Sequence, residues 1–232
     1  MSKKTIYFPH NFLLFAVLML ILVLAIALLF IGALGTAFAK VGFKPTAIAL
    51  ILVATFVGSY VNIPLLKLRS VIPVIEEEFV SFFGMVYRIP RVEYGEATTI
   101  LAINVGGALV PTLVSFYLLW KLPSATIYAV IGVAVVALAT HFVARPVKGV
   151  GIVTPAFLPP LVAAITAYLL PFHAHQIIAY VAGVLGTLIG ADLLNLHVIP
   201  ELGAPVASIG GAGTFDGVFL SGIMAVLLEL IL

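Results

Sequence analysis

The chain has 232 residues, of which 63% are hydrophobic and 9% charged, and its formal net charge at pH 7 is +2. Soluble domains average roughly 45–50% apolar and about 25% charged residues, so this composition excludes a soluble protein. The small net charge excludes a nucleic-acid partner, and the lack of cysteine excludes a disulfide framework and thiolate chemistry.

Seven apolar stretches have about the twenty residues that a membrane-spanning helix needs. We therefore expect an all-α fold with about seven transmembrane helices, forming a single integral membrane domain over residues 1–232. The first stretch is too long for a signal-peptide core, so we interpret it as an uncleaved span. The expected spans are Phe12–Phe38, Thr46–Leu66, Thr98–Trp120, Ser124–Ala144, Gly151–Leu170, His175–Leu196 and Val206–Leu232.

The distribution of Lys and Arg gives the orientation, because cytoplasmic loops of membrane proteins carry an excess of these residues. If the N-terminus is cytoplasmic, only Lys40, Lys44 and Lys121 fall on the opposite side. We therefore expect a multi-pass protein of the cell membrane with a cytoplasmic N-terminus. That side then collects Lys3, Lys4, Lys67, Arg69, Arg88, Arg91, Arg145 and Lys148.

The long connection Lys67–Ala97 falls on the cytoplasmic side in this topology. It alternates imperfectly between apolar and polar residues, and Pro73, Gly84 and Pro90 disfavour one continuous helix. We expect two short extended segments that lie at the membrane surface.

An internal repeat links two parts of the chain. The segment Val105–Phe116 aligns without a gap with Ile209–Leu220, with four identities that include Gly106 and Gly107 against Gly210 and Gly211. We therefore predict that spans six and seven repeat the structure of spans two and three. Repeats four spans apart have the same orientation, so this is a parallel repeat, with halves at about 12–121 and 124–232.

The chain contains two aspartates, Asp192 and Asp216, and both lie in the second copy. An acid inside a membrane helix costs roughly 2.5–3.5 kcal/mol on insertion scales, which makes each a candidate for function. If spans six and seven are antiparallel neighbours joined near Gly203, both acids reach a similar depth. Such a pair suits an aspartyl hydrolase, in which one carboxylate activates water and the other donates a proton, and equally an ion-coupled carrier.

Glycine, asparagine and proline residues surround this pair, and we list them as candidate substrate-binding residues. Three glycines in four positions weaken a helix, which indicates a broken seventh span whose free amides face a cavity. Tight helix packing and hydrogen bonding between spans explain several of the others equally well. The candidates are Gly190, Asn195, Gly210, Gly211, Gly213, Gly217, Asn104 and Pro155.

Two family resemblances accompany these residues. Asn104–Ala108, Gly190–Leu196 and Ser208–Gly217 resemble a family of archaeal and bacterial membrane proteins of unknown function over nearly the whole chain. More faintly, two aspartates on consecutive spans resemble the presenilin-type and prepilin-peptidase intramembrane aspartyl proteases. Gly213 matches the first glycine of their Gly-x-Gly-Asp signature, and Phe215 stands in place of the second. That resemblance implies Asp192 and Asp216 as the catalytic pair.

These patterns favour an intramembrane aspartyl-type hydrolase that uses Asp192 and Asp216. The alternatives are an ion-coupled transporter or channel that uses the same acids, and a non-catalytic membrane assembly protein. The histidines lie near opposite ends of the spans, so we expect no metal site, and no cofactor motif is present. Expected partners are membrane lipid, a transmembrane peptide or small-molecule substrate, and a second copy of the chain.

Overall fold

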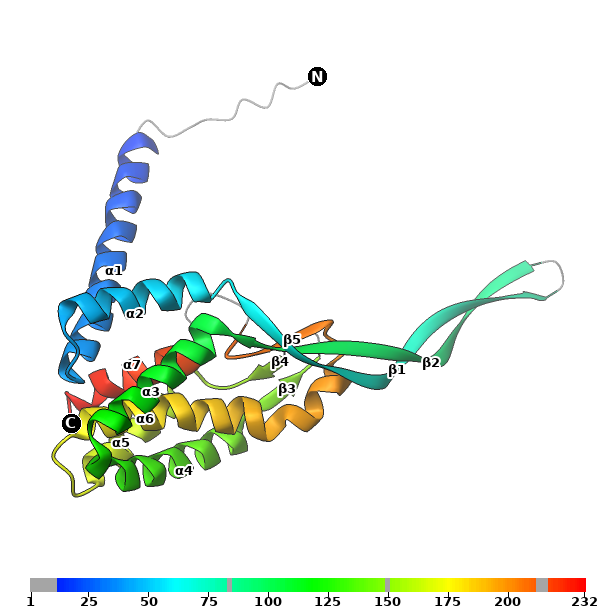
Figure 1. Cartoon of the computed structure of the whole chain (residues 1–232). Helices are drawn as coiled ribbons and strands as arrows, with labels where there is room; N and C mark the ends of the chain where they lie inside the picture. The colour runs from blue at the N-terminus through cyan, green and yellow to red at the C-terminus, as the bar shows by residue number, and fades with distance from the viewer. Residues whose placement is uncertain (1–11, 83–84, 149–150, 212–216) are drawn as a thin grey trace.

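The computed structural model describes residues 12–82, 85–148, 151–211 and 217–232, and it shows a helical bundle capped at one end by a small sheet (Figure 1). The helices are α1 (Phe12–Lys40), α2 (Pro45–Gly58), α3 (Val110–Lys121), α4 (Thr126–Val143), α5 (Leu158–Leu169), α6 (His175–Thr187) and α7 (Gly217–Glu229). The strands are β1 (Asn62–Phe82), β2 (Met85–Asn104), β3 (Arg145–Val147), β4 (Gly151–Val153) and β5 (Val206–Ile209).

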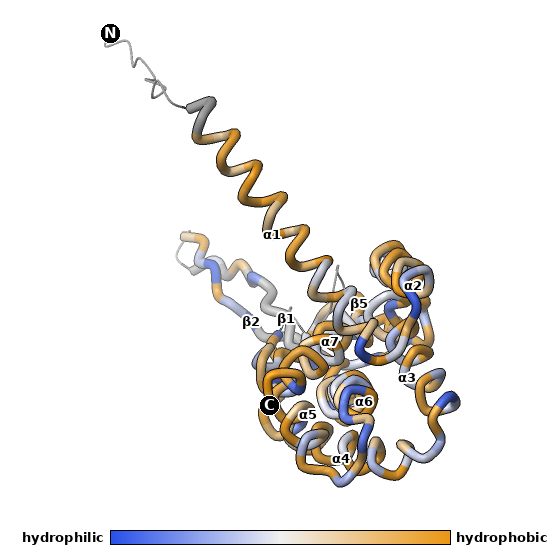
Figure 2. The backbone as a smooth tube through the Cα atoms, turned by 90° about the vertical axis from the view of Figure 1, so that its left-hand side faces the viewer, coloured by the Kyte–Doolittle hydropathy of each residue, from blue (hydrophilic) through white to orange (hydrophobic). Residues whose placement is uncertain are grey.

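Three helical segments of the described chain are long and apolar enough to cross a membrane: Phe15–Lys40, Pro123–Val143 and His175–Leu202. The first extends out of the bundle on its N-terminal side, and most of its residues are hydrophobic (Figure 2). Only 6% of its most apolar 18 residues are buried, and Leu34, Ala37 and Phe38 anchor its last turns in the core. Lipid or another chain must cover the rest, because an apolar surface of this size is unfavourable in water.

Helix α6 forms the centre of the bundle and packs against α4, α5 and α7. Small residues bring these helices together. A Cβ on Gly183 would lie 2.8 Å from the Ser221 carbonyl oxygen of α7, and one on Gly132 of α4 would lie 2.9 Å from the Ala182 Cβ. Close backbone approach of this kind is typical of helices that pack in membranes, where dispersion contacts take the place of the hydrophobic effect.

The sheet has the order β1–β2–β5 and joins distant parts of the chain. Strands β1 and β2 form a long antiparallel hairpin, and β5 pairs in parallel with β2, placing Ile103 beside Ile209. The outer part of the hairpin extends away from the helices (Figure 1). Strands β3 and β4 form a separate two-stranded hairpin.

The expected all-α class is therefore corrected: the protein is mostly helical but contains sheets. Residues at the ends of four predicted spans are strands, namely 62–66, 98–104, 151–153 and 206–209. Their helices α2, α3, α5 and α7 are correspondingly short, at 12 to 14 residues. Proline explains part of this, since Pro45, Pro111 and Pro159 each lie in the first turn of a helix and Pro64 interrupts the pairing beside a bulge.

The connection over residues 67–97 is extended, as the sequence predicted. It is longer than expected, because the two segments pair with each other along the whole hairpin instead of lying as separate short pieces. Among the hairpin residues whose side chains the structure describes, the apolar Val71, Phe79, Val86 and Ile89 are all exposed, so the apolar positions of the pattern do not mark a buried face.

Candidate functional site

Helix α6 continues without a break into two irregular segments, and Asp192 lies where they meet. The π-helical turn η3 (Leu188–Asp192) is followed by the 3₁₀ segment η4 (Leu193–Leu202). The Asn195 Nδ2 donates to the carbonyl oxygens of Gly190 at 3.0 Å and Ala191 at 2.9 Å, which compensates for the altered helical bonding. Single π-turns inside helices frequently occur at functional sites.

The connection after β5 brings a backbone N–H to this carboxylate. Gly210 and Gly211 have φ values of 78° and 80°, a left-handed conformation that glycine adopts without steric cost. A Cβ on Gly210 would also lie 2.5 Å from the Ala108 Cβ. In this conformation the Gly210 N–H donates to the Asp192 Oδ2 at 2.9 Å.

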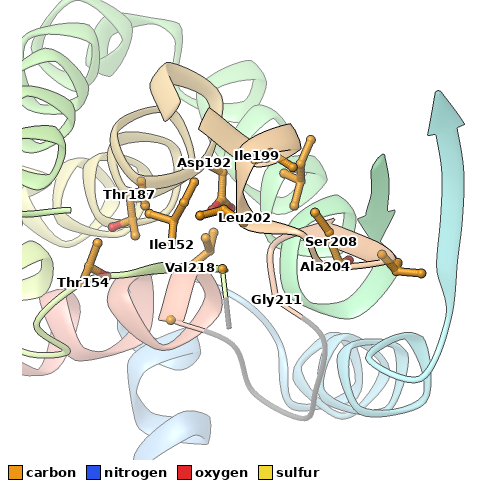
Figure 3. Close-up of a pocket in the computed structure, with 16 residues that line it drawn as sticks. Ile152, Thr154, Thr187, Asp192, Ile199, Leu202, Ala204, Ser208, Gly211 and Val218 are labelled. Atoms are coloured by element: carbon orange, nitrogen blue, oxygen red, sulfur yellow. The ribbon is translucent and has the colours of Figure 1, made fainter. Parts of the chain in front are cut away.

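Asp192 lines a cavity of about 170 Å³ (Figure 3). Hydroxyl groups accompany the carboxylate, from Thr187 on α6, Thr154 after β4 and Ser208 on β5. Each water molecule needs roughly 10–15 Å³ of cavity volume. Several waters or a small hydrated ion therefore fit, whereas an extended peptide does not. The remaining lining residues are Gly151, Ile152, Ala191, Ile199, Leu202, Ala204, Val206, Ala207, Ile209, Gly211, Gly217 and Val218.

Beside the cavity, Asn104 holds the sheet to the helices. It is fully buried, and its Nδ2 donates to the Ser59 carbonyl oxygen at 2.8 Å and to the Asn62 Oδ1 at 3.0 Å. Its own Oδ1 accepts from the Gly107 N–H at 2.7 Å, at the start of the π-helical turn η1 (Val105–Leu109). Asn62 Oδ1 also accepts from the Ser208 hydroxyl at 2.6 Å, which connects the network to the cavity wall.

Replacing Asn104 by leucine is expected to destabilise the protein by roughly 3 kcal/mol or more. The substitution removes three hydrogen bonds and leaves buried partner groups unsatisfied, each at a cost of about 1–3 kcal/mol. Thermal unfolding of the purified protein in detergent measures this loss. Ser124→Ala, at an exposed position on the surface, is the control and should shift stability by no more than about 0.5 kcal/mol. Equal melting temperatures for the two variants would show that the network is not needed for the fold.

The structure brings some of the predicted residues to one place. Asp192, Gly211 and Gly217 line the cavity, and Gly210 reaches it through its N–H group. Gly217 begins α7 and has open space around it, since a Cβ there would meet nothing within 4 Å. Asp216 and Gly213 lie outside the described residues, so the expected meeting of the two aspartates stays a prediction.

The other candidates lie beside the cavity and not in its wall. Asn104 and Asn195 make the structural hydrogen bonds given above. Gly190 is buried against α4, where a Cβ would lie 2.9 Å from the Thr140 Cβ. Pro155 is exposed, and its carbonyl oxygen accepts from the Leu158 N–H at 3.2 Å at the start of α5.

Sequence reasoning missed the three hydroxyl residues Thr154, Thr187 and Ser208. Thr187 precedes Asp192 by five residues, a spacing that an ordinary helix places on different faces and that the π-turn changes. Ser208 stands two residues before the Gly210–Gly211 pair, and this proximity was the available signal. Within the described segments, no three His, Cys, Asp or Glu side chains gather in a way that could hold a metal ion.

The fold and the cavity define a mostly helical protein with membrane-length apolar helices and an acid-containing cavity at one end of its central helix. Residues 56–228 match the model of a family described as a protein of unknown function (DUF1614). The chain belongs to this family, which agrees with the first resemblance noted in the sequence. No curated protein and no solved structure matches the chain.

Proposed function

We propose that this protein is an ion-coupled transporter or channel in which Asp192 binds the coupling ion. The observation that carries the proposal is the position of this carboxylate where a membrane-length helix changes from π-helical to 3₁₀ geometry, inside a polar-lined cavity. Acids within membrane segments commonly mark ion pathways. Interrupted helices commonly form the binding sites of secondary transporters, because their unwound backbone offers free polar groups.

The chemistry of the cavity suits a small cation. The Asp192 carboxylate supplies a negative charge, and the hydroxyls of Thr154, Thr187 and Ser208 supply neutral oxygen atoms. Protons and hard cations such as sodium both favour oxygen partners. The Gly210 N–H holds one carboxylate oxygen in place, so the charge is oriented before an ion arrives.

The finer topology is part of this proposal: a cell-membrane protein with seven crossing segments and a cytoplasmic N-terminus. Contacts at the end of the bundle opposite the sheet support a topology in which successive segments run in alternating directions. Lys121 Nζ at the end of α3 donates to the Gly42 carbonyl oxygen after α1, at 3.3 Å. The rings of Tyr128 on α4 and Phe172 before α6 lie 5.0 Å apart.

The parallel internal repeat is also part of the proposal. In both copies a strand leads through a Gly-Gly pair, Gly106–Gly107 or Gly210–Gly211, toward an apolar helix. The strands β2 and β5 are parallel neighbours, and the contact of Gly210 with Ala108 joins the two glycine-rich segments. Two broken segments that face each other in one site are a common arrangement in transporters built from repeats.

An intramembrane aspartyl-type hydrolase is the second candidate, and one observation favours it. Gly217, which directly follows Asp216 in the sequence, lines the same cavity as Asp192. Cleavage of a labelled transmembrane peptide by the purified protein, lost on replacing either aspartate by asparagine, would support this function over transport. The small cavity volume favours the carrier, because a peptide substrate needs a longer groove.

Ion flux into liposomes tests the proposed function. The purified protein should accelerate proton or sodium movement when a gradient of that ion is imposed, and the rate should saturate as the ion concentration rises. Protein-containing and empty liposomes with equal fluxes of both ions would refute it.

A further inference from the structure

Polar side chains follow the interface between α6 and α7 from one end to the other. On α6, Gln176, Tyr180 and Thr187 recur at intervals of four and seven residues, a spacing that keeps them on one helix face. On α7, Ser221 and Glu229 are eight residues apart and also share a face. All but Gln176 are buried, and Gln176 is half-buried. Packing of two apolar helices does not by itself require polar side chains in the interface, so these residues call for another explanation.

The end of this interface away from the Asp192 cavity holds a buried acid. The Glu229 side chain is 6% exposed, and its Oε1 lies 3.4 Å from the Nδ1 of His175. Its Oε2 accepts from the Gln176 Nε2 at 2.8 Å. His175 is 28% exposed, and its ring contacts that of Tyr168 on α5. Within the described chain, His175 is the ionisable group in ion-pair contact with Glu229, and it connects the buried carboxyl to water.

Three further hydroxyl residues, Tyr180, Thr187 and Ser221, lie along α6 and α7 between the buried acid and the cavity. The Tyr180 hydroxyl is buried and has no hydrogen-bond partner among the described residues. An unpaired buried hydroxyl is costly, so a role in binding a transient water or proton would explain its presence. The Thr187 hydroxyl donates to that of Ser221 at 2.9 Å, and Thr187 also lines the Asp192 cavity.

The length of the interface matches a large part of the membrane. Seventeen residues separate His175 from Asp192, which at 1.5 Å per residue gives roughly 25 Å along the helix. The hydrocarbon core of a bilayer is about 30 Å thick. The Glu229–His175 pair and the Asp192 cavity are therefore separated along α6 by a distance close to the thickness of the hydrocarbon core.

We infer that the coupling ion is a proton and that it travels along the α6–α7 interface between the Glu229–His175 pair and Asp192. This inference rests on the proposed function and specifies its ion and its route. A sodium ion needs several oxygen ligands at once, whereas the interface offers single polar groups in succession. Chains of Asp, Glu and His residues form proton relays in other membrane proteins.

The transfer steps conserve protons and need no other reactant. A proton taken up from water by the His175 imidazole passes from Nδ1 to the Glu229 Oε1, which leaves a neutral imidazole and a neutral carboxyl group. The Tyr180, Ser221 and Thr187 hydroxyls then each accept one proton and release their own, with water bridging the gaps. The last step protonates the Asp192 carboxylate, and the reverse sequence returns the proton.

Proton flux into liposomes that contain a pH-sensitive dye tests the route. Glu229→Gln should lower the flux by about 100-fold, the scale of a lost proton-transfer group, and Tyr180→Phe by about tenfold. Tyr180→Phe removes one unpaired hydroxyl without changing the packing, so it tests the route even where Glu229→Gln fails to fold. Glu201→Gln, an exposed acid on η4, is the matched control and should keep the wild-type rate.

The outcomes separate this inference from the proposed function. Loss of proton flux in both interface variants, with the control unchanged, supports the route. Flux that requires Asp192 but persists in Glu229→Gln and Tyr180→Phe overturns the route and leaves the transporter. Sodium flux without proton flux also overturns the route while leaving the transporter. No flux of either ion in the wild type overturns both.

Discussion

Asp192→Asn is expected to lower gradient-driven ion flux by about 100-fold or more. A carboxylate and a cation about 4 Å apart attract by roughly 4 kcal/mol at an effective dielectric constant of 20, and asparagine loses this attraction. The fold should survive, because the asparagine Oδ1 still accepts the hydrogen bond from the Gly210 N–H. Flux assays of the purified variant in liposomes measure the change.

The control for this variant is Glu201→Gln, which removes an acid from the exposed surface of η4, outside the cavity wall. It should transport at the wild-type rate. If Asp192→Asn and Glu201→Gln both retain full flux, Asp192 has no part in ion binding and the proposed site is wrong.

Gly106→Ala is expected to destabilise the fold strongly. Gly106 lies where η1 crosses the end of α2, and a Cβ at this position would overlap the Thr55 carbonyl oxygen and the Ser59 nitrogen. These are backbone atoms, so neither can move aside as the end of a flexible side chain would. We expect destabilisation of about 3 kcal/mol or more, at the upper end of the usual cost of overpacking. Thermal unfolding in detergent and the yield of folded protein measure the effect.

The matched control is Gly32→Ala. Gly32 also lies in a helical segment, and a Cβ there would meet nothing within 4 Å. Alanine is favoured over glycine inside a helix by up to about 1 kcal/mol, so this variant should be as stable as the wild type or slightly more stable. If the Gly106→Ala variant had the same melting temperature as the Gly32→Ala variant, the close contact between α2 and η1 would be contradicted.

Much of the helical framework could be predicted from the sequence. Apolar stretches of the sequence coincide with the seven α-helices of the described residues, because both membrane-spanning and buried helices need apolar residues over most of their length. The strands at their ends could not be predicted in this way. In the segments 62–66 and 98–104, a short run of apolar residues suits a strand as well as a helix, and hydropathy alone does not separate the two.

The candidate site was predictable in part. Asp192 stood out because an acid within an apolar span is expensive. The roles of Asn104 and Asn195 depended on contacts across the fold, such as the bond from Asn104 to the Ser59 carbonyl oxygen, 45 positions away. The Glu229–His175 pair escaped notice because each residue stands at the end of a span, where a charge is ordinary. Only the packing of α6 against α7 shows that Glu229 is buried.

The most direct test of the account is thiol labelling inside the Asp192 cavity. The chain has no cysteine, so Thr154→Cys introduces a single thiol in the cavity wall. A membrane-impermeant thiol reagent should label it from the face that carries the β1–β2 hairpin, and the coupling cation should slow the labelling. In the Asp192→Asn background, the cation should no longer slow it. An ion-binding cavity at this site would be contradicted if the thiol were not labelled, or if the cation did not change the labelling rate in the protein that keeps Asp192.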